Sequence, residues 1–245
     1  MKIALIGYGK MGHIIEKIAR ERGHEIVSII DEHNPEEFDS PAFASADAAI
    51  EFTIPSSAAA NVEKCFEKGV PVVSGTTAWT DRLPEMKDRC DKGEGTLLWA
   101  SNFSVGVNIF KALNRYLTRM MNAFPQYTPR MVETHHVHKL DHPSGTAVTL
   151  AEELIEESKS INRWAEPAEG VTLDADTLEI DYIRSGEVPG IHTIEWDSAQ
   201  DTISITHSAK SREGFAMGAV LAAEWLSSKK GFHTIDEMFG EIIPS

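Results

Sequence analysis

The chain has few cysteines, no excess of positive charge and no apolar run long enough to cross a bilayer. Only two of its 245 residues are cysteines, Cys65 and Cys90, and they lack the spacing of metal ligands. A disulfide framework is therefore excluded, and a reducing compartment such as the cytoplasm is expected. Without a spanning apolar run or an N-terminal signal pattern, we expect neither a membrane protein nor a secreted one.

Basic residues are also scarce. The 23 Lys and Arg face 38 Asp and Glu, which gives a formal net charge of −15 and a pI near 5.1. Such a surface repels nucleic acid and anionic membranes, so we exclude both as partners. No internal repeat or low-complexity segment is present. The 42% hydrophobic content is ordinary for a globular protein, and the length suits one large or two modest domains.

The N-terminus carries a glycine-rich turn between a strand and a helix. Lys2–Ile6 is a short apolar run, and a helical pattern extends from His13 to Arg22. Between them lie Gly7, Tyr8, Gly9, Lys10, Met11 and Gly12. The first glycine permits a tight turn, the second lets the backbone approach a pyrophosphate, and the third lets the helix pack on the strand. This turn predicts a dinucleotide site.

An acidic residue supports the same prediction and bears on the choice of cofactor. A second apolar run, 25–30, ends at Asp31. A carboxylate in this position accepts hydrogen bonds from the ribose hydroxyls and repels a 2′-phosphate. Glu32 follows it instead of an arginine that could bind a phosphate, so we expect NADH to be favoured. Lys10 and His33 leave use of NADPH open.

Three further apolar runs, 48–52, 70–74 and 96–100, alternate with helical patterns. This alternation predicts an α/β fold with a Rossmann-like parallel sheet. In such a sheet, ligands bind at the carboxyl ends of the strands. Those ends carry Phe52-Thr53, Gly75-Thr76-Thr77 and Asn102-Phe103.

From residue 105 the pattern changes, and a second domain is expected. A long amphipathic helix, 108–121, precedes a strand at 130–133 and a helix that ends near residue 159. Three β-rich segments, 177–184, 190–196 and 202–209, predict an open sheet that is mixed or antiparallel, with hairpin-like connections. The Ala-rich and Gly-rich helix at 214–228 is expected to return to the first domain. The predicted domains are therefore 1–104, completed by 213–245, and 105–212.

Four of the ten histidines fall between His135 and His142, and Lys139 lies among them. Imidazoles beside an ammonium group suit a small polyanion and proton transfer near neutral pH. A spacing of four residues places His135 and Lys139 on one face of either a helix or a strand. Ser144 then begins a helical pattern, whose exposed N–H groups would hold a carboxylate.

A metal site is the alternative interpretation of this cluster, because His-His-x-His could supply imidazole ligands. Lys139 would repel a cation there, and the cysteines lie far away in the sequence. We therefore expect no metal.

The segment Glu133–Ala147 resembles the signature of the 4-hydroxy-tetrahydrodipicolinate reductase family, also called dihydrodipicolinate reductase. The resemblance extends over most of the chain. It includes the glycine turn, Phe52–Pro55, Gly75–Thr77, Ser101–Asn108, Ser211-Arg212 and Phe215–Ala219. It implies a homotetrameric enzyme of the diaminopimelate route to lysine. The enzyme reduces the cyclic product of aspartate semialdehyde and pyruvate to tetrahydrodipicolinate with NADH or NADPH.

The resemblance also implies roles for individual residues. His135 would be the proton donor and Lys139 its catalytic partner, because hydride transfer leaves an enamine-like intermediate that needs a proton. The residues that would hold the substrate are His136, Ser144, Gly145 and Thr146. The residues that would line the nicotinamide side are Gly75, Thr76, Thr77, Ala100, Ser101, Asn102 and Phe103. Phe215 would pack against the nicotinamide ring. His142 stands where the family has a small residue, and we expect it to point to solvent.

Two other functions remain open from the residues alone. One is another NAD(P)-dependent reductase, or an amino-acid dehydrogenase, that acts on small dicarboxylates. The other is a non-catalytic NAD(H)-sensing protein. The pair His135 and Lys139 argues against a sensor, which needs no acid beside a nicotinamide.

Overall fold

The computed structural model describes residues 1–243, which fold into two compact units. The first unit consists of Met1–Val105 and Arg212–Ser245, and the second is Gly106–Ser211. Each boundary between the two units lies one residue away from the predicted domain boundary. Among the described residues, no helix combines the length and the apolar character needed to cross a bilayer.

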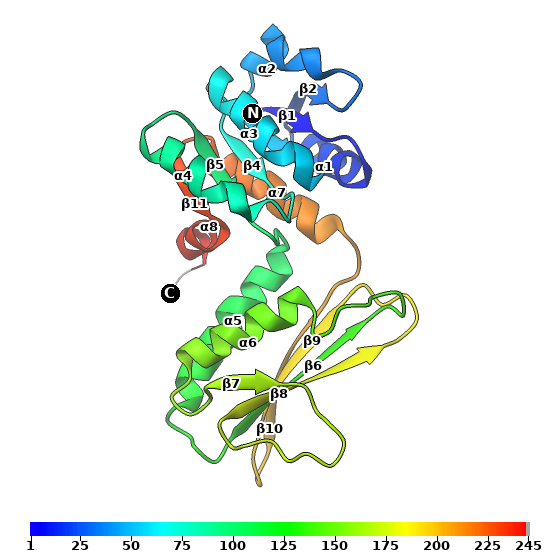
Figure 1. The fold of residues 1–245 in the computed structure, drawn as a ribbon, viewed down its shortest axis with the longest axis vertical. Coiled ribbons are helices and arrows are strands. Elements are labelled where there is room, and N and C mark those ends of the chain that lie inside the picture. Colours follow the sequence, from blue (N-terminus) through cyan, green and yellow to red (C-terminus); the bar gives the residue numbers. More distant parts are fainter. Residues whose placement is uncertain (244–245) are drawn as a thin grey trace. The chain divides into compact units, whose positions relative to one another are not determined.

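The first unit contains a six-stranded sheet in the order β11-β5-β4-β3-β1-β2, and every neighbouring pair is parallel. This confirms the predicted Rossmann-like sheet (Figure 1). The strands are β1 (Lys2–Ile6), β2 (Glu25–Ile30), β3 (Ala48–Glu51), β4 (Val72–Ser74), β5 (Thr96–Trp99) and β11 (Gly231–Thr234). The sequence analysis missed β11, because its four residues show no apolar run.

Helices cover both faces of this sheet. They are α1 (Lys10–Glu21), α2 (Pro41–Ala44), α3 (Pro55–Lys68), α4 (Leu83–Asp91), α7 (Glu213–Leu226) and α8 (Ile235–Ile242), with 3-10 helices at Pro35–Asp39 and Thr80–Arg82. Ile3 and Leu5 pack in the core with α1 and α7, whereas Ala4 and Ile6 pack in the core with α3. Burial on both faces explains why β1 is apolar throughout. The contacts of α7 with α1 and β3 confirm that this helix returns to the first unit.

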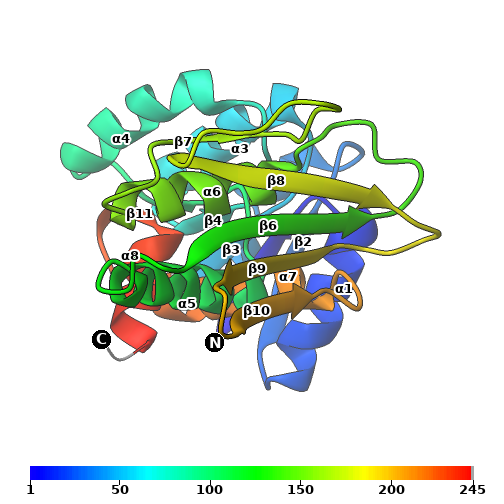
Figure 2. The same cartoon turned by 90° about the horizontal axis from the view of Figure 1, so that it is seen from below.

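The second unit contains a mixed five-stranded sheet in the order β10-β9-β6-β8-β7, visible in Figure 2. Its elements are α5 (Val105–Met121), β6 (Thr128–His135), α6 (Gly145–Glu157), β7 (Arg163–Ala165), β8 (Thr177–Arg184), β9 (Ile191–Asp197) and β10 (Thr202–Ser208). The pair β9–β10 is an antiparallel hairpin, as predicted. The expected hairpin between β8 and β9 is wrong, because β6 lies between them, parallel to β8 and antiparallel to β9.

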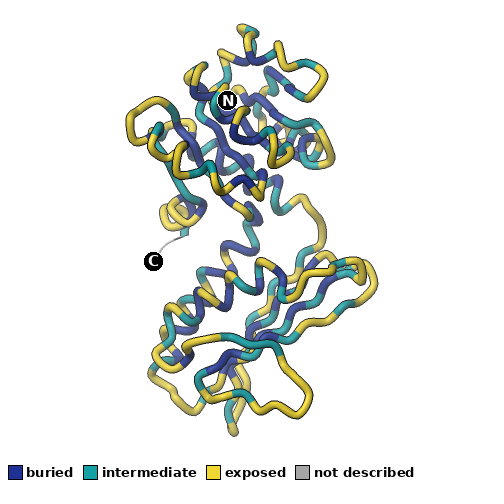
Figure 3. The backbone as a smooth tube through the Cα atoms, viewed as in Figure 1, coloured by how far each residue is buried: buried dark blue, intermediate teal, exposed yellow. Residues whose placement is uncertain are grey.

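One face of this second sheet is packed against helices. Met131, Ile180 and Ile194 point into a core that also contains Phe110 of α5 and Leu150 of α6. Figure 3 shows buried stretches along the strands and helices of this unit. Side chains alternate across a strand, so the residues between them face the other way and are partly or fully exposed.

Candidate active site

The glycine turn joins β1 to α1 and has no room for side chains at its first and last glycines. Gly7 has a φ of 92°, and a Cβ there would lie 2.1 Å from the carbonyl oxygen of Phe52. A Cβ on Gly12 would lie 2.4 Å from the Gly7 carbonyl oxygen. No side chain caps the start of α1 at Gly9. The first N–H groups of α1 therefore remain available to a phosphate.

A cavity of about 590 Å³ extends from this turn across the ends of β1, β2 and β3. This size lies in the usual range for cofactor pockets. Gly7, Gly9 and Asp31, which the sequence analysis assigned to a dinucleotide, line it together with Thr53. The Asp31 carboxylate accepts a hydrogen bond from the N–H of His33 at 2.8 Å. These residues fit an adenine dinucleotide.

Two walls of this cavity were not predicted. Pro35 and Phe38 belong to the 3-10 helix that follows β2, and Asn61 lies on α3. The helix α3 follows Ile54 directly, and Pro55 occupies its first position, where its missing N–H costs nothing.

A buried carboxylate at the end of β3 was missed as well. Glu51 is fully buried and accepts hydrogen bonds from the hydroxyls of Ser74 and Thr76, at 2.6 and 2.9 Å. The N–H and hydroxyl of Thr53 donate to the same carboxylate. These bonds fix the ends of β3 and β4 relative to each other. A charged residue inside the apolar run 48–52 was the signal that could have identified it.

The residues predicted for the nicotinamide side follow two adjacent strands, β4 and β5. A Cβ on Gly75 would lie 2.1 Å from the ring of Phe52, so the chain is tightly packed there. Thr76 is buried, and its carbonyl oxygen accepts bonds from Trp79 and Trp99. Phe103 is also buried, and its carbonyl oxygen lies so close to α7 that a Cβ on Gly218 would be 1.7 Å from it. The remaining predicted residues lie at the same ends: Thr77, Ala100, Ser101 and Asn102.

In the second unit, the histidine cluster begins where β6 ends. His135 is the last residue of β6, and a loop connects it to α6. The expectation that His135 and Lys139 share a face of a strand or helix is wrong, because regular structure stops before Lys139. The Lys139 ammonium instead forms an ion pair with Asp141 at 2.7 Å. Ser144 caps α6 as predicted, since its hydroxyl accepts a bond from the N–H of Ala147.

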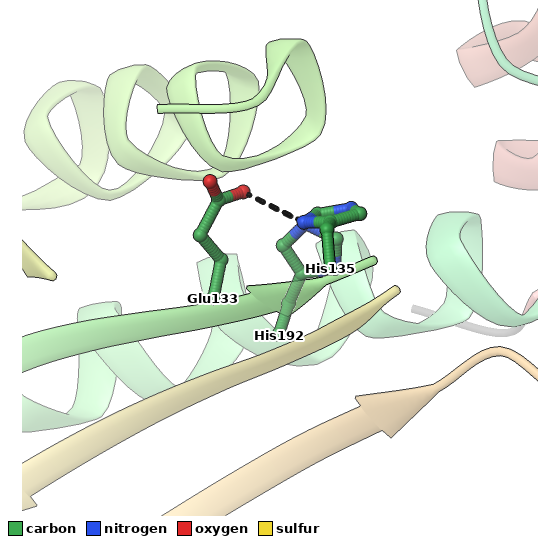
Figure 4. Close-up of side chains that lie close together, drawn as sticks. All are labelled: Glu133, His135 and His192. Atoms are coloured by element: carbon green, nitrogen blue, oxygen red, sulfur yellow. Dashed lines mark ion pairs between the residues drawn. The ribbon is translucent and has the colours of Figure 1, made fainter. Parts of the chain in front are cut away.

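Glu133 organises this site, although the sequence analysis gave it no role. Its carboxylate is fully buried and accepts a bond from the Ser144 N–H at 3.1 Å for each oxygen. Arg184 donates to Oε1 at 3.2 Å. Figure 4 shows Oε2 directed toward His135, whose Nδ1 lies 3.4 Å away. His192 lies opposite Glu133 on β9, with its Nε2 3.7 Å from Oε2.

The two buried histidines have lowered pKa values. Burial lowers the pKa of His135, the charge of Glu133 raises it, and Lys139 and Arg184 lower it further. Burial, with the nearby His135, lowers the pKa of His192 to about 4. His192 is therefore neutral near pH 7, and it shares a hydrogen bond of 3.2 Å with the Ser144 hydroxyl.

The other histidines of the cluster differ in their surroundings. The Nδ1 of His136 is buried and has no hydrogen-bond partner among the residues described. His138 is exposed and pairs with Glu187. His142 does not simply point to solvent, as had been expected: it pairs with Glu166 at 2.6 Å and stacks on Tyr182.

Glu133, His135 and His192 could in principle hold a metal ion, since their donor atoms lie within 4.8 Å of one another. The guanidinium of Arg184 already binds the carboxylate, and Lys139 adds a second positive charge nearby. Both charges disfavour a cation. We therefore interpret the cluster as a hydrogen-bonding one.

Comparisons with known proteins agree over the whole chain. One family model, described as dihydrodipicolinate reductase, N-terminus, matches residues 1–103, and its C-terminal counterpart matches residues 106–239. A 4-hydroxy-tetrahydrodipicolinate reductase of Christiangramia forsetii is 42% identical over 246 residues, covering 99% of each chain. One of Archaeoglobus fulgidus is 35% identical, covering 97% of this chain and 99% of that one.

The fold is also found among solved structures. A dipicolinate-bound dihydrodipicolinate reductase from Paenisporosarcina sp. TG-14 is similar, with a TM-score of 0.76 and 20% sequence identity. The match covers 96% of this chain and 97% of that chain.

Proposed function

This chain belongs to the dihydrodipicolinate reductase family, the NAD(P)H-dependent reductases of lysine biosynthesis, and we propose that its proton donor is His135. The substrate is 4-hydroxy-tetrahydrodipicolinate and the product tetrahydrodipicolinate. One observation carries the assignment: His135 is buried at the end of β6, and the carboxylate beside it also binds the start of α6. A proton donor and a carboxylate-binding helix end are thus built at one place.

The first unit would bind the cofactor. The N–H groups at the start of α1 would hold its pyrophosphate, Asp31 its ribose, and the ends of β4 and β5 its nicotinamide. A reduced nicotinamide supplies the hydride when bound. Phe215, in the first turn of α7, would pack against that ring.

Asp31 favours NADH over NADPH in this proposal, because its carboxylate lines the cavity and repels a 2′-phosphate. Comparison of kcat/KM for the two cofactors tests it. A strong preference for NADPH contradicts the role of Asp31.

The second unit binds the substrate. Its two carboxylates are held by the N–H groups of Gly145 and Thr146 at the start of α6, by Ser144 and by His136. Lys139 exchanges Asp141 for a substrate carboxylate and stabilises the negative charge that develops beside it. His135 then donates its proton to the electron-rich carbon of the reduced ring.

The proposed function is tested by following NADH oxidation with the purified chain. We expect turnover of the tetrahydrodipicolinate precursor, none of aspartate, and competitive inhibition by dipicolinate, a planar dicarboxylate. Failure of dipicolinate to bind with cofactor present contradicts the roles given to Gly145 and Thr146.

We also propose that the enzyme is a cytoplasmic homotetramer, assembled through the second unit. The sheet face opposite α5 and α6 carries apolar side chains that are exposed or partly exposed, Val132, Ile183 and Ile191. A partner subunit would cover them. Both cysteines are free and buried, which suits a reducing compartment.

A further inference from the structure

The carboxylate of Glu133 makes two kinds of contact at once. Its Oε1 accepts from Arg184, while its Oε2 faces the Nδ1 of His135. Both oxygens accept from the N–H of Ser144, the residue that caps α6. One buried carboxylate on β6 therefore contacts both the proposed proton donor and the helix whose first N–H groups would bind the substrate.

The two ring nitrogens of His135 have different surroundings. Its Nδ1 is buried, has no hydrogen-bond partner among the described residues, and lies 3.4 Å from the Glu133 carboxylate. A Cβ on Gly190 would lie 3.0 Å from its Nε2, so the absence of a side chain leaves space there. In the imidazolium form of His135, the Nδ1–H faces the Glu133 carboxylate and the Nε2–H is the proton available for donation.

His192 supports this arrangement from the neighbouring strand. Its ring packs edge-on against His135, with 5.2 Å between the ring centroids, and its Nε2 shares a hydrogen bond with the Ser144 hydroxyl. Sheet register creates the contact, because His192 lies opposite Glu133 and Arg184 lies opposite His135. The cluster is thus built from β6, β8, β9 and the start of α6.

Charge distinguishes Glu133 from the other neighbours of His135. Lys139 and Arg184 are cationic, and His136 and His192 are imidazoles. None of these four groups favours a positive charge on His135. Glu133 is the one group in this set that favours the imidazolium. A carboxylate also selects the tautomer with the proton on Nδ1, as in other acid–imidazole pairs.

We propose that Glu133 is a positioning residue that orients the proton donor His135 and, through the N–H of Ser144, couples it to the carboxylate-binding start of α6. This inference rests on the proposed role of His135. An amide at position 133 keeps an acceptor for the Ser144 N–H but loses the charge and offers a donor in place of one acceptor.

The test is Glu133→Gln, compared with Glu187→Gln as a matched control. Glu187 is an exposed carboxylate that pairs with His138 and lies outside the proposed machinery. We expect Glu133→Gln to lower kcat by about 10- to 100-fold and to leave the Kd of dipicolinate within about threefold. The control should change neither value.

The pH dependence of activity is a second measurement, and it would not change if Glu133 only stabilised the fold. Removal of the Glu133 charge leaves only groups that oppose protonation of His135, so its pKa falls. The loss of activity with rising pH should then begin at a lower pH. NMR titration of the His135 ring in the cofactor-free protein should show a lower pKa in Glu133→Gln than in the wild type. Glu133→Asp, which keeps the charge, should recover part of both effects and serves as the second variant if the amide prevents folding.

The outcomes separate this inference from the proposed function. If His135→Gln retains activity, the proposed function fails whatever Glu133 does. If His135→Gln is inactive while Glu133→Gln keeps its kcat, its pH profile and its His135 titration, only the positioning role of Glu133 is overturned. A stoichiometric metal in the purified protein that is lost in Glu133→Gln would also overturn it.

Discussion

Each unit contains a fully buried glutamate, and the two are stabilised by different partners. Glu51 accepts bonds from the hydroxyls of Ser74 and Thr76 and from Thr53, and no ion pair is found for it among residues 1–243. Glu133 has a cation, Arg184, and the Ser144 N–H. A buried charge is tolerated only when it is hydrogen-bonded or paired. Glu51 therefore fixes the ends of β3 and β4 beside the cavity, whereas Glu133, in our proposal, orients the proton donor His135.

Replacement of Glu51 by alanine should destabilise the first unit. It leaves the Ser74 and Thr76 hydroxyls buried without their acceptor, which we expect to cost about 2–4 kcal/mol in the free energy of unfolding. Urea unfolding measures this cost. Glu85→Ala is the matched control, because Glu85 forms an exposed ion pair with Arg82 and should change little. Equal stability of the two variants would show that the Glu51 bonds contribute nothing.

The lowered pKa of His192 predicts how stability depends on pH. An unfolded chain protonates this histidine below about pH 6.5, whereas the folded protein resists protonation until about pH 4. The contribution of the neutral His192 ring to the free energy of unfolding is fully present above about pH 6.5 and decreases as the pH falls toward 4. Unfolding free energies measured across this window should decrease less in His192→Gln. An identical slope in both proteins argues against burial of a neutral His192.

At the scale of elements, the sequence predicted those structural features that depend on residues close together in the chain. The β1–α1–β2 unit and the cap at Ser144 were correct, because glycine turns and helix caps are local patterns. The pairing of β8 with β9 was wrong, because insertion of β6 between them is a non-local event. For the same reason, Glu133 and His192 could not be brought together from sequence spacing. Lys139 was misplaced because the end of β6 could not be fixed to a residue.

The glycine turn offers a test in which stability and binding separate. A Cβ on Gly9 meets nothing within 4 Å, whereas one on Gly7 would collide with Phe52. We expect Gly9→Ala to fold normally and to bind NADH at least about tenfold more weakly, because the methyl group blocks the pyrophosphate. Gly7→Ala should lower the melting temperature as well. Normal NADH affinity in Gly9→Ala, measured by calorimetry, rules out a pyrophosphate at this turn.

At the scale of the whole molecule, a chain of net charge −15 binds an anionic substrate and an anionic cofactor. In our proposal the binding groups are local: the N–H groups at the starts of α1 and α6, and the cation Lys139. Backbone N–H groups attract anions whatever the net charge of the protein.

The proposed tetramer predicts a molar mass near four times the chain mass of 27.0 kDa. Light scattering after size-exclusion chromatography measures it. Ile183→Asp should reduce the mass, because it places a charge on the uncovered sheet face. A monomeric wild-type protein at micromolar concentration contradicts the assembly but leaves the chemistry of His135 untouched.

The central claim, that His135 supplies the proton, is tested most directly by the turnover of His135→Gln at saturating NADH and substrate. We predict a decrease in kcat of about two or more orders of magnitude, with the Kd of NADH within about threefold of the wild-type value. A kcat close to that of the wild type, or a loss confined to NADH binding, would contradict the account.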